Sequence, residues 1–279
     1  MEIITVPCLD ASQAAVLWEC VHEHSQHSRV AVLDEEGATY ALVEAQEALL
    51  VSEARIRASS IEPRQVGTLS CGFRLNPSLT SVILPGVSLR DAGATALARN
   101  LADCAGLLSL DIGENSLRAP GCSAVSEALS AGCSSLTSVR LAWNCLGMAG
   151  FEALGSMFRH CRKLRSLDLT STMPGEGGLV AMAESLATSS LTNLELTFAD
   201  TVGRGGAALG KVLCENSGLT RLDIWDMEPT GEGTAAVLSS MRRMTSLQSL
   251  VLIKQREPVA PERGAASAAW CQELGSVVS

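Results

Sequence analysis

The sequence lacks the features by which enzymes, membrane proteins and disulfide-rich secreted domains are usually recognised. It contains no Gly-x-x-x-x-Gly-Lys-[Ser/Thr], no His-Glu-x-x-His and no Gly-x-Ser-x-Gly at a strand end. No apolar run reaches the ~18 residues of a membrane span. Ten cysteines include no Cys-x-x-Cys, and the start MEIITVPCLD lacks the basic and apolar stretches of a signal peptide. We therefore expect no catalytic activity, no cofactor and no metal, in a cytoplasmic protein with reduced thiols.

The chain also has few aromatic residues, and its net charge is negative. Aromatics make up 3% of the chain, whereas hydrophobic residues reach 47% and charged residues only 18%. Such a chain is not disordered, and its core must be built from small aliphatic side chains. The net charge of −9 disfavours binding to the phosphate backbone of nucleic acids.

A segment with the pattern L-x-x-[LV]-x-[LI] recurs every 27 to 29 residues. It starts at Leu79, Leu107, Leu136, Leu164, Leu191, Leu219 and Leu247. Its fourth and sixth positions alternate with period 2, which predicts a strand with one buried face. We expect the fourth positions to stack as one ladder beneath a parallel sheet. These are Leu110, Val139, Leu167, Leu194 and Leu222.

A second pattern runs in phase with the first. Fourteen residues after each of the first six starts stands a glycine, and three residues later an alanine. The spacing Gly-x-x-Ala-Leu-x-x-x-Leu predicts a helix with one buried stripe. We expect the glycine to open the helix or to turn the chain into it, and the alanine to let the helix approach the strand. Because helices are wider than strand spacings, the stack should curve into a horseshoe.

These residues resemble the ribonuclease-inhibitor-like leucine-rich repeats, whose pattern is L-x-x-L-x-L-x-x-[NC]-x-L. Asn115 and Asn144 stand at the family's asparagine position, where the resemblance implies bonds to backbone groups at the strand exit. Other repeats depart from the pattern at Val87, Thr172, Pro174, Ala199, Met227 and Pro229. Over about residues 76–254 the resemblance implies an α/β leucine-rich-repeat solenoid, with a parallel concave sheet and convex helices. Cys104, Cys133 and Cys161, each three residues before a repeat start, fit a structural slot between helix and strand.

The two ends do not repeat. Residues 1–70 predict a small α/β unit or cap, residues 71–254 hold six full repeats and a terminal strand, and residues 255–279 form a tail or a cap in which Trp270 covers the last layer. The first unit is predicted to contain strands at Ile3–Pro7, Arg29–Leu33 and Thr39–Val43, a turn at Glu35–Gly37, and helices at about Ser12–His24 and Glu44–Ile56. The stretch RVAVLDEEGATYALVEAQEALL resembles half of a cystathionine-β-synthase-type (CBS) domain. Those domains pair to hold an adenine nucleotide, which would imply nucleotide sensing and oligomerisation through this unit.

Candidate chemical groups are few. His22, His24 and His27 have a spacing that could hold a metal, but a solvated helix end explains them equally, and no third ligand type is placed. His160, the remaining histidine, is expected at a helix end and in solvent. The basic run RHCRKLR, with Arg159, Arg162, Lys163 and Arg165, offers a second surface.

The strand positions that the core does not use are expected to line the concave face. The fifth position carries four carboxylates, interrupted by one arginine. The candidate partner-binding residues are Asp111, Arg140, Asp168, Glu195, Asp223, Arg221, Trp143, Phe198 and Trp225. An acidic strip beside aromatic residues is typical of a protein-binding patch, in which aromatics anchor and charge steers. A charged fifth position that only keeps the sheet soluble is the competing interpretation.

The sequence thus predicts a non-enzymatic protein-interaction scaffold or adaptor, a subunit of a larger assembly whose partner has a basic or mixed-charge surface. No nucleic acid or membrane partner is expected. The first alternative is a regulator of a small GTPase, because the Ran GTPase-activating proteins use this repeat class. Its contacts would be sought at Arg90, Arg118 and Asn144. The second alternative is nucleotide sensing through residues 1–56.

Overall fold

The computed structural model describes residues 3–6, 29–33, 39–44, 53–55, 60–75, 79–197, 204–216, 218–225, 232–241 and 243–253. The strands are β1 (Ile3–Val6), β2 (Arg29–Leu33), β3 (Thr39–Glu44), β4 (Glu53–Arg55), β5 (Ser81–Ile83), β6 (Ser109–Asp111), β7 (Ser138–Arg140), β8 (Ser166–Leu169), β9 (Asn193–Thr197), β10 (Arg221–Trp225) and β11 (Ser249–Ile253). The helices are α2 (Pro63–Leu75), α3 (Arg90–Leu101), α4 (Ala119–Gly132), α5 (Gly147–His160), α6 (Gly175–Ala187), α7 (Arg204–Glu215) and α8 (Glu232–Met241).

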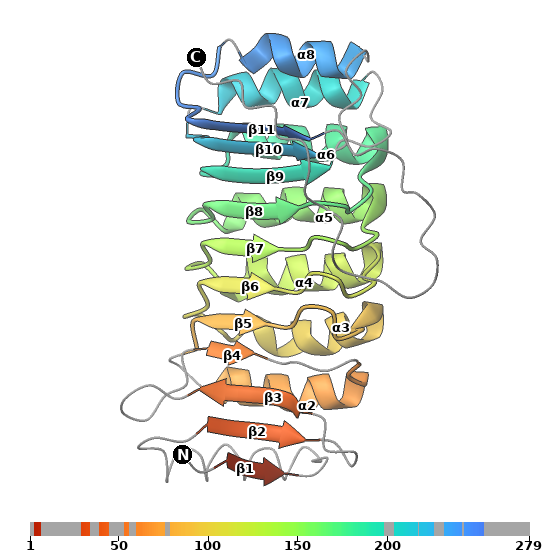
Figure 1. The fold of residues 1–279 in the computed structure, drawn as a ribbon, viewed down its shortest axis with the longest axis vertical. Coiled ribbons are helices and arrows are strands. Elements are labelled where there is room, and N and C mark those ends of the chain that lie inside the picture. The colour runs from red at the N-terminus through yellow and green to blue at the C-terminus, as the bar shows by residue number, and fades with distance from the viewer. Residues whose placement is uncertain are drawn as a thin grey trace.

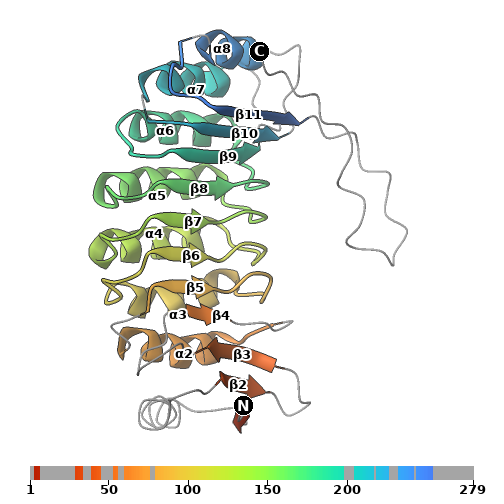
Figure 2. The ribbon, with the colours of Figure 1, turned by 60° about the vertical axis from the view of Figure 1, so that its left-hand side comes forward.

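The strands form one sheet in which each lies beside its neighbours in chain order, from β1 to β11. All pairs from β4 to β11 are parallel, and the helices stack along one face of the sheet (Figures 1 and 2). Each repeat therefore contributes one strand to the sheet and one helix to the layer that covers one face of the sheet. This is the leucine-rich-repeat solenoid that the periodicity predicted.

The predicted leucine ladder is confirmed. Leu110 pairs in register with Val139, and Val139 with Leu167. Leu194 continues the row and pairs with Leu222 of β10. Each of the five is at most 1% exposed, so a continuous apolar column lies between sheet and helices. Burial of such side chains contributes about 1.5–3 kcal/mol each.

The predicted helices are present, and the repeated glycines lie in their first turns. Gly121 lies within α4, where an added Cβ would stand 2.7 Å from Asp91 Oδ1 at the start of α3. This glycine thus permits close contact between neighbouring helices, while Gly147 and Gly175, with φ of 59° and 58°, begin α5 and α6. Of the repeated alanines, Ala124 and Ala208 pack against the apolar core, whereas Ala153 lines a groove between α4 and α5. Among the described helices, none combines the length and apolarity needed to cross a membrane.

The N-terminal strands extend the same sheet. β1, β2 and β3 agree with the predicted strands to within one residue, and the antiparallel β2–β3 pair gives the predicted hairpin return. The predicted helix at Glu44–Ile56 is wrong in part, because Glu44 ends β3 and Glu53–Arg55 form β4, which pairs with both β3 and β5. Strand pairing here overrides the helix propensity of an Ala-, Glu- and Leu-rich stretch. The predicted helix at Ser12–His24, the turn at Glu35–Gly37, the three clustered histidines and Trp270 lie outside the described residues.

The helix α2 was not predicted, and it spans the predicted boundary at residue 70. It packs beside α3, where Ser70 accepts a hydrogen bond from Asn100 Nδ2 at 2.7 Å. The division of the chain at this boundary stays a prediction.

The asparagines act as the resemblance implied. Asn144 is 1% exposed, and its Oδ1 accepts the backbone N–H groups of Asn115 and Leu117 at 3.1 and 2.9 Å. Its Nδ2 donates to backbone carbonyls, including those of Ile112 and Leu141. Asn115 bonds to the preceding repeat in the same way, through Val87 and Leu89. These amides satisfy buried backbone groups that have no strand partner.

The cysteine slot is confirmed by burial and hydrogen bonding. Cys104, Cys133 and Cys161 are at most 6% exposed. The Cys133 thiol donates to the carbonyl of Leu101 at 3.2 Å, and the Cys161 thiol to that of Leu129 at 3.6 Å. Burial raises the pKa of Cys133 to about 12 and that of Cys104 and Cys161 to about 11. These thiols stay protonated and link successive repeats.

Candidate functional site

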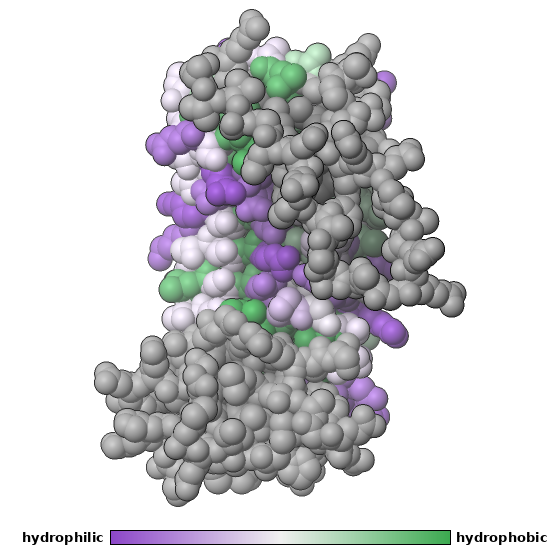
Figure 3. Space-filling view, viewed as in Figure 1, coloured by the Kyte–Doolittle hydropathy of each residue, from purple (hydrophilic) through white to green (hydrophobic). Residues whose placement is uncertain are grey.

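The fifth-position side chains lie side by side across five strands of the exposed sheet face. Asp111 pairs in register with Arg140, and Arg140 with Asp168. Glu195 follows on β9 and Asp223 on β10. Neighbouring strands are ~4.8 Å apart, so these charges act on one another directly. Figure 3 shows hydrophilic side chains among small, weakly polar ones on this face.

Arg140 forms ion pairs with the carboxylates around it in the first half of the row. Its Nη1 lies 3.2 Å from Asp111 Oδ1, its Nε 3.1 Å from Asp168 Oδ2, and its Nη2 3.6 Å from Glu114 Oε1. Burial alone would lower the pKa of Arg140, but the carboxylates of Asp111 and Asp168 raise it above its ordinary value. A side chain at Gly113 would overlap Nη1 of this arginine, so the repeat leaves space for the guanidinium.

The same two aspartates also fix the backbone where their strands end. Asp111 Oδ1 accepts the N–H of Gly113 at 3.0 Å, and Asp168 Oδ1 accepts that of Thr170 at 2.9 Å. Their charge and hydrogen-bonding capacity are thus used within the protein. Of the candidate partner-binding carboxylates, Asp111 and Asp168 are thus already engaged within the protein.

Glu195 differs from its neighbours. Its carboxylate makes no hydrogen bond and no ion pair with any described residue. Burial raises the pKa of Glu195 above the ordinary value, and the nearby carboxylates of Asp168 and Asp223 raise it further. Arg221 and Arg140 act in the opposite direction without cancelling this. Among the described residues, Glu195 therefore has no ion-pair partner.

Asp223 lies beside Glu195 and is 4% exposed, although it stands on the exposed side of the sheet pattern. Its Oδ2 accepts hydrogen bonds from Arg221 at 2.6 and 3.1 Å. Its Oδ1 is buried and has no hydrogen-bond partner in the described part of the chain. Arg221, whose side chain is 48% exposed, is thus occupied by Asp223 rather than by Glu195.

A charge count summarises the face. Five carboxylates (Asp111, Glu114, Asp168, Glu195 and Asp223) stand against Arg140 and Arg221, which leaves a net charge of −3. The β6–β8 part contributes −2 of this charge and the β9–β10 part −1, and only in the latter is a carboxylate, that of Glu195, left without an ion pair to a described residue. Within the described residues, no group of three or more His, Cys, Asp or Glu side chains is arranged to hold a metal ion.

Of the three predicted aromatic anchors, Trp143 can be placed. It follows β7 and is 48% exposed. Phe198 and the side chain of Trp225 lie outside the described residues. Two exposed methionines that the sequence did not single out, Met148 and Met173, lie in the same and the next repeat at 55% and 70% exposure.

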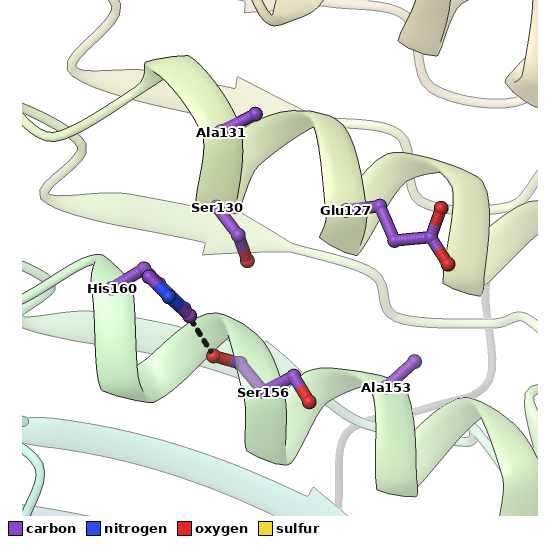
Figure 4. Close-up of a pocket in the computed structure, with 6 residues that line it drawn as sticks. All are labelled: Glu127, Ser130, Ala131, Ala153, Ser156 and His160. Atoms are coloured by element: carbon purple, nitrogen blue, oxygen red, sulfur yellow. Dashed lines mark hydrogen bonds between the residues drawn. The ribbon is translucent and has the colours of Figure 1, made fainter.

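The helical side offers a second, weaker candidate. A shallow groove of about 360 Å³ lies between α4 and α5, where Ser130 points toward α5 (Figure 4). It is lined by Glu127, Ser130, Ala131, Ala153, Ser156 and His160. His160 is exposed at the end of α5, as predicted, and its Nδ1 lies 3.0 Å from the carbonyl oxygen of Ser156.

The basic run next to this groove bonds mostly to the protein itself. Arg162 donates to the carbonyl of Arg159 at 2.9 Å, and Arg165 to that of Ser190 at 3.0 Å. These bonds are what a solvated turn requires.

The three residues considered for GTPase regulation do not act together. Arg90 and Arg118 are exposed at the starts of α3 and α4. Asn144 is buried within its hydrogen-bond ladder and is therefore not available to a partner.

Comparison with known proteins adds no family assignment. No family model matches the chain, and no curated protein matches it. Among solved structures, the chain in a TLR13–ssRNA13 complex aligns with a TM-score of 0.41 and 18% identity, over 70% of this chain and 31% of that one. Leiomodin-1 actin-binding site 2 aligns with a TM-score of 0.31 and 14% identity, over 69% of this chain and 79% of that one. This protein thus spans about 31% of the TLR13 chain. Its own strand register and buried ladder define it as a leucine-rich-repeat solenoid.

Proposed function

We propose that this protein is a non-enzymatic interaction module that captures a basic side chain of a protein partner at Glu195. The carrying observation is that the Glu195 carboxylate forms no ion pair with any described residue, while its neighbours Asp168 and Asp223 are paired with arginines. A carboxylate held among like charges gains most from an incoming cation, because that cation relieves repulsion as well as forming a pair.

The partner's chemistry follows from the charge of this face. A net charge of −3 over the row favours a lysine or arginine on a basic or mixed-charge protein surface. The repeats, at 27 to 29 residues with a full helix in each, support the ribonuclease-inhibitor-like type. The buried, protonated thiols suit a reducing intracellular setting, in which the protein would serve as a scaffold or adaptor in a larger assembly.

The test is quantitative capture from the native source with the full chain as bait. Glu195→Lys reverses the unpaired charge, and Glu152→Lys makes the same reversal on the exposed surface of α5. We expect Glu195→Lys to lose a specific set of bound proteins that Glu152→Lys retains. Equal capture by both variants would refute the proposal, provided that both melt at the wild-type temperature.

Asp168→Lys is a poor choice for this test. It would place a second cation against Arg140, whose Nε lies 3.1 Å from Asp168 Oδ2, and so would damage the fold as well as the surface. Regulation of a GTPase and nucleotide sensing stay predictions from resemblance. Single-turnover GTP hydrolysis with a GTPase panel, and thermal shifts with AMP, ATP and S-adenosylmethionine, test them.

A further inference from the structure

Trp143 lies at a backbone position with a left-handed conformation, which is unfavourable for a bulky side chain. The equivalent residues of the neighbouring repeats are Gly86, Glu114 and Ser171, and all four have φ between 55° and 66°. Left-handed backbone costs a bulky residue about 1 kcal/mol or more, whereas glycine and small polar residues tolerate it better. The loop itself is held by Asn144, whose amide donates to the carbonyls of Leu141 and Ala142.

Met173 repeats this pattern in the next repeat. It has φ of 53°, and its equivalents Ser88 and Ser116, at 54°, are serines. An exposed apolar side chain thus stands twice at left-handed positions where neighbouring repeats carry glycine, glutamate or serine. Exposed apolar residues at strained positions are candidates for binding.

The two residues belong to one surface. The loops that carry them are joined by hydrogen bonds from Trp143 N to the carbonyl of Thr170 at 2.7 Å and from Leu146 N to that of Thr172 at 3.1 Å. Met148 bridges the same two repeats, because its Sδ would stand 2.6 Å from a Cβ on Gly177 of α6. We name Trp143, Met148 and Met173 the apolar rim. It lies at the end of the strands, next to the acidic face.

We propose that the apolar rim binds an aliphatic or aromatic side chain from the same partner segment whose basic residue pairs with Glu195. This inference rests on the proposed function. The charges beside the rim support it, because Glu114 and Glu176 are exposed there and would repel an acidic segment. Tryptophan and methionine suit such an anchor, since they offer large and adaptable apolar contact area.

The geometry sets the spacing of the two anchors on the partner. Trp143 lies three residues beyond Arg140, which is roughly 10 Å along the strand direction. Glu195 lies two strands away from Arg140, again roughly 10 Å. The diagonal of roughly 14 Å equals about four residues of an extended chain at ~3.3 Å each. The partner segment should therefore carry its apolar anchor and its lysine or arginine about four residues apart.

Selection from a random peptide library displayed on phage, with the full chain as target, tests this directly. We expect enriched peptides to combine an apolar residue with a basic one at a spacing of about three to five residues. The most enriched peptide, synthesised with a fluorescent label, is then titrated against four proteins by anisotropy. These are the wild type, Trp143→Ser, Met173→Ser and Glu195→Gln.

The serine variants install residues that neighbouring repeats carry in the same slots, so their melting temperatures should not fall. Trp143→Ser and Glu195→Gln should each weaken binding roughly tenfold, and Met173→Ser by less. If Glu195→Gln weakens binding but Trp143→Ser binds within twofold of wild type, the apolar rim is not a binding site. The proposed function of Glu195 would still stand. Binding that needs Trp143 but not Glu195, or a library that enriches no such pattern, would overturn the two-anchor segment.

Discussion

The repeats around β6 to β8 and those around β9 and β10 share one strand register but treat their charges and their turns differently. In the first group, Asn115 and Asn144 complete the strand exits, and Arg140 pairs with Asp111 and Asp168. In the second group the asparagine position is occupied by Ala199 and Met227. The charged side chains of the first group thus stabilise the solenoid through ion pairs. In the second group, the carboxylate of Glu195 forms no ion pair with a described residue.

The largest expected effect concerns the asparagine ladder of the first group. Asn144→Leu removes the partners of several buried backbone groups, and each such loss costs about 1–3 kcal/mol. We expect chemical denaturation to show a loss of at least about 3 kcal/mol. Asn144→Thr should cost less, because Thr172 fills the next repeat's slot and donates to the carbonyl of Leu169 at 2.7 Å. Equal losses for both variants would show that the ladder is not the cause.

The cysteine slot gives the next effect, which depends on pH. The pKa of Cys133 is raised by burial from 9.0 to about 12, so its folded form keeps the proton that the unfolded chain releases. Its contribution is complete below pH 9 and is lost as pH rises toward 12. Stability should fall by roughly 1 kcal/mol per cysteine between pH 9 and pH 10.

Denaturation midpoints at pH 7, 9 and 10 measure this fall. In Cys133→Ala the fall should be shallower than in the wild type. Thr188 and Asn216 fill the same slot in the second group and do not titrate in this range. An unchanged slope in the variant would argue against the thiol as its origin.

Arg140→Met tests the internal neutralisation. It leaves Asp111, Glu114 and Asp168 without their shared cation, but the arginine side chain is 33% exposed and solvent screens the loss. Thermal unfolding should show a destabilisation of about 1 kcal/mol. The loss should shrink in high salt, because ions screen the attraction. A loss that is independent of salt would point to packing rather than charge.

The sequence predicted the repeats well because their signal is periodic and local to each segment. The stacking of Leu110 on Val139 follows from strand periodicity alone. Contacts between repeats were harder to foresee, because they depend on side-chain direction across ~28 residues of chain. Asp91 Oδ1, for example, accepts the N–H groups of Arg118 and Gly121 and so caps the following helix. Neither α2 nor β4 was predicted, because neither carries the repeat pattern.

The candidate site was predicted in position but not in character. The row from Asp111 to Asp223 was expected, yet its division by Arg140 depends on distances that a sequence does not contain. Met173 could have been noticed as an apolar residue at a loop position that carries Ser88 and Ser116 in other repeats.

The division of the sheet face is tested most directly by two matched neutralisations, Asp111→Asn and Glu195→Gln, in thermal unfolding at pH 7. Asp111 forms an ion pair with Arg140, so Asp111→Asn should lower the melting temperature. The pKa of Glu195 is raised by burial and by its acidic neighbours, so its charge opposes folding at pH 7 and its removal should raise that temperature. We expect melting-temperature shifts of opposite sign, each corresponding to a change of at most about 1 kcal/mol in the free energy of unfolding. A fall in melting temperature for both variants would contradict the account.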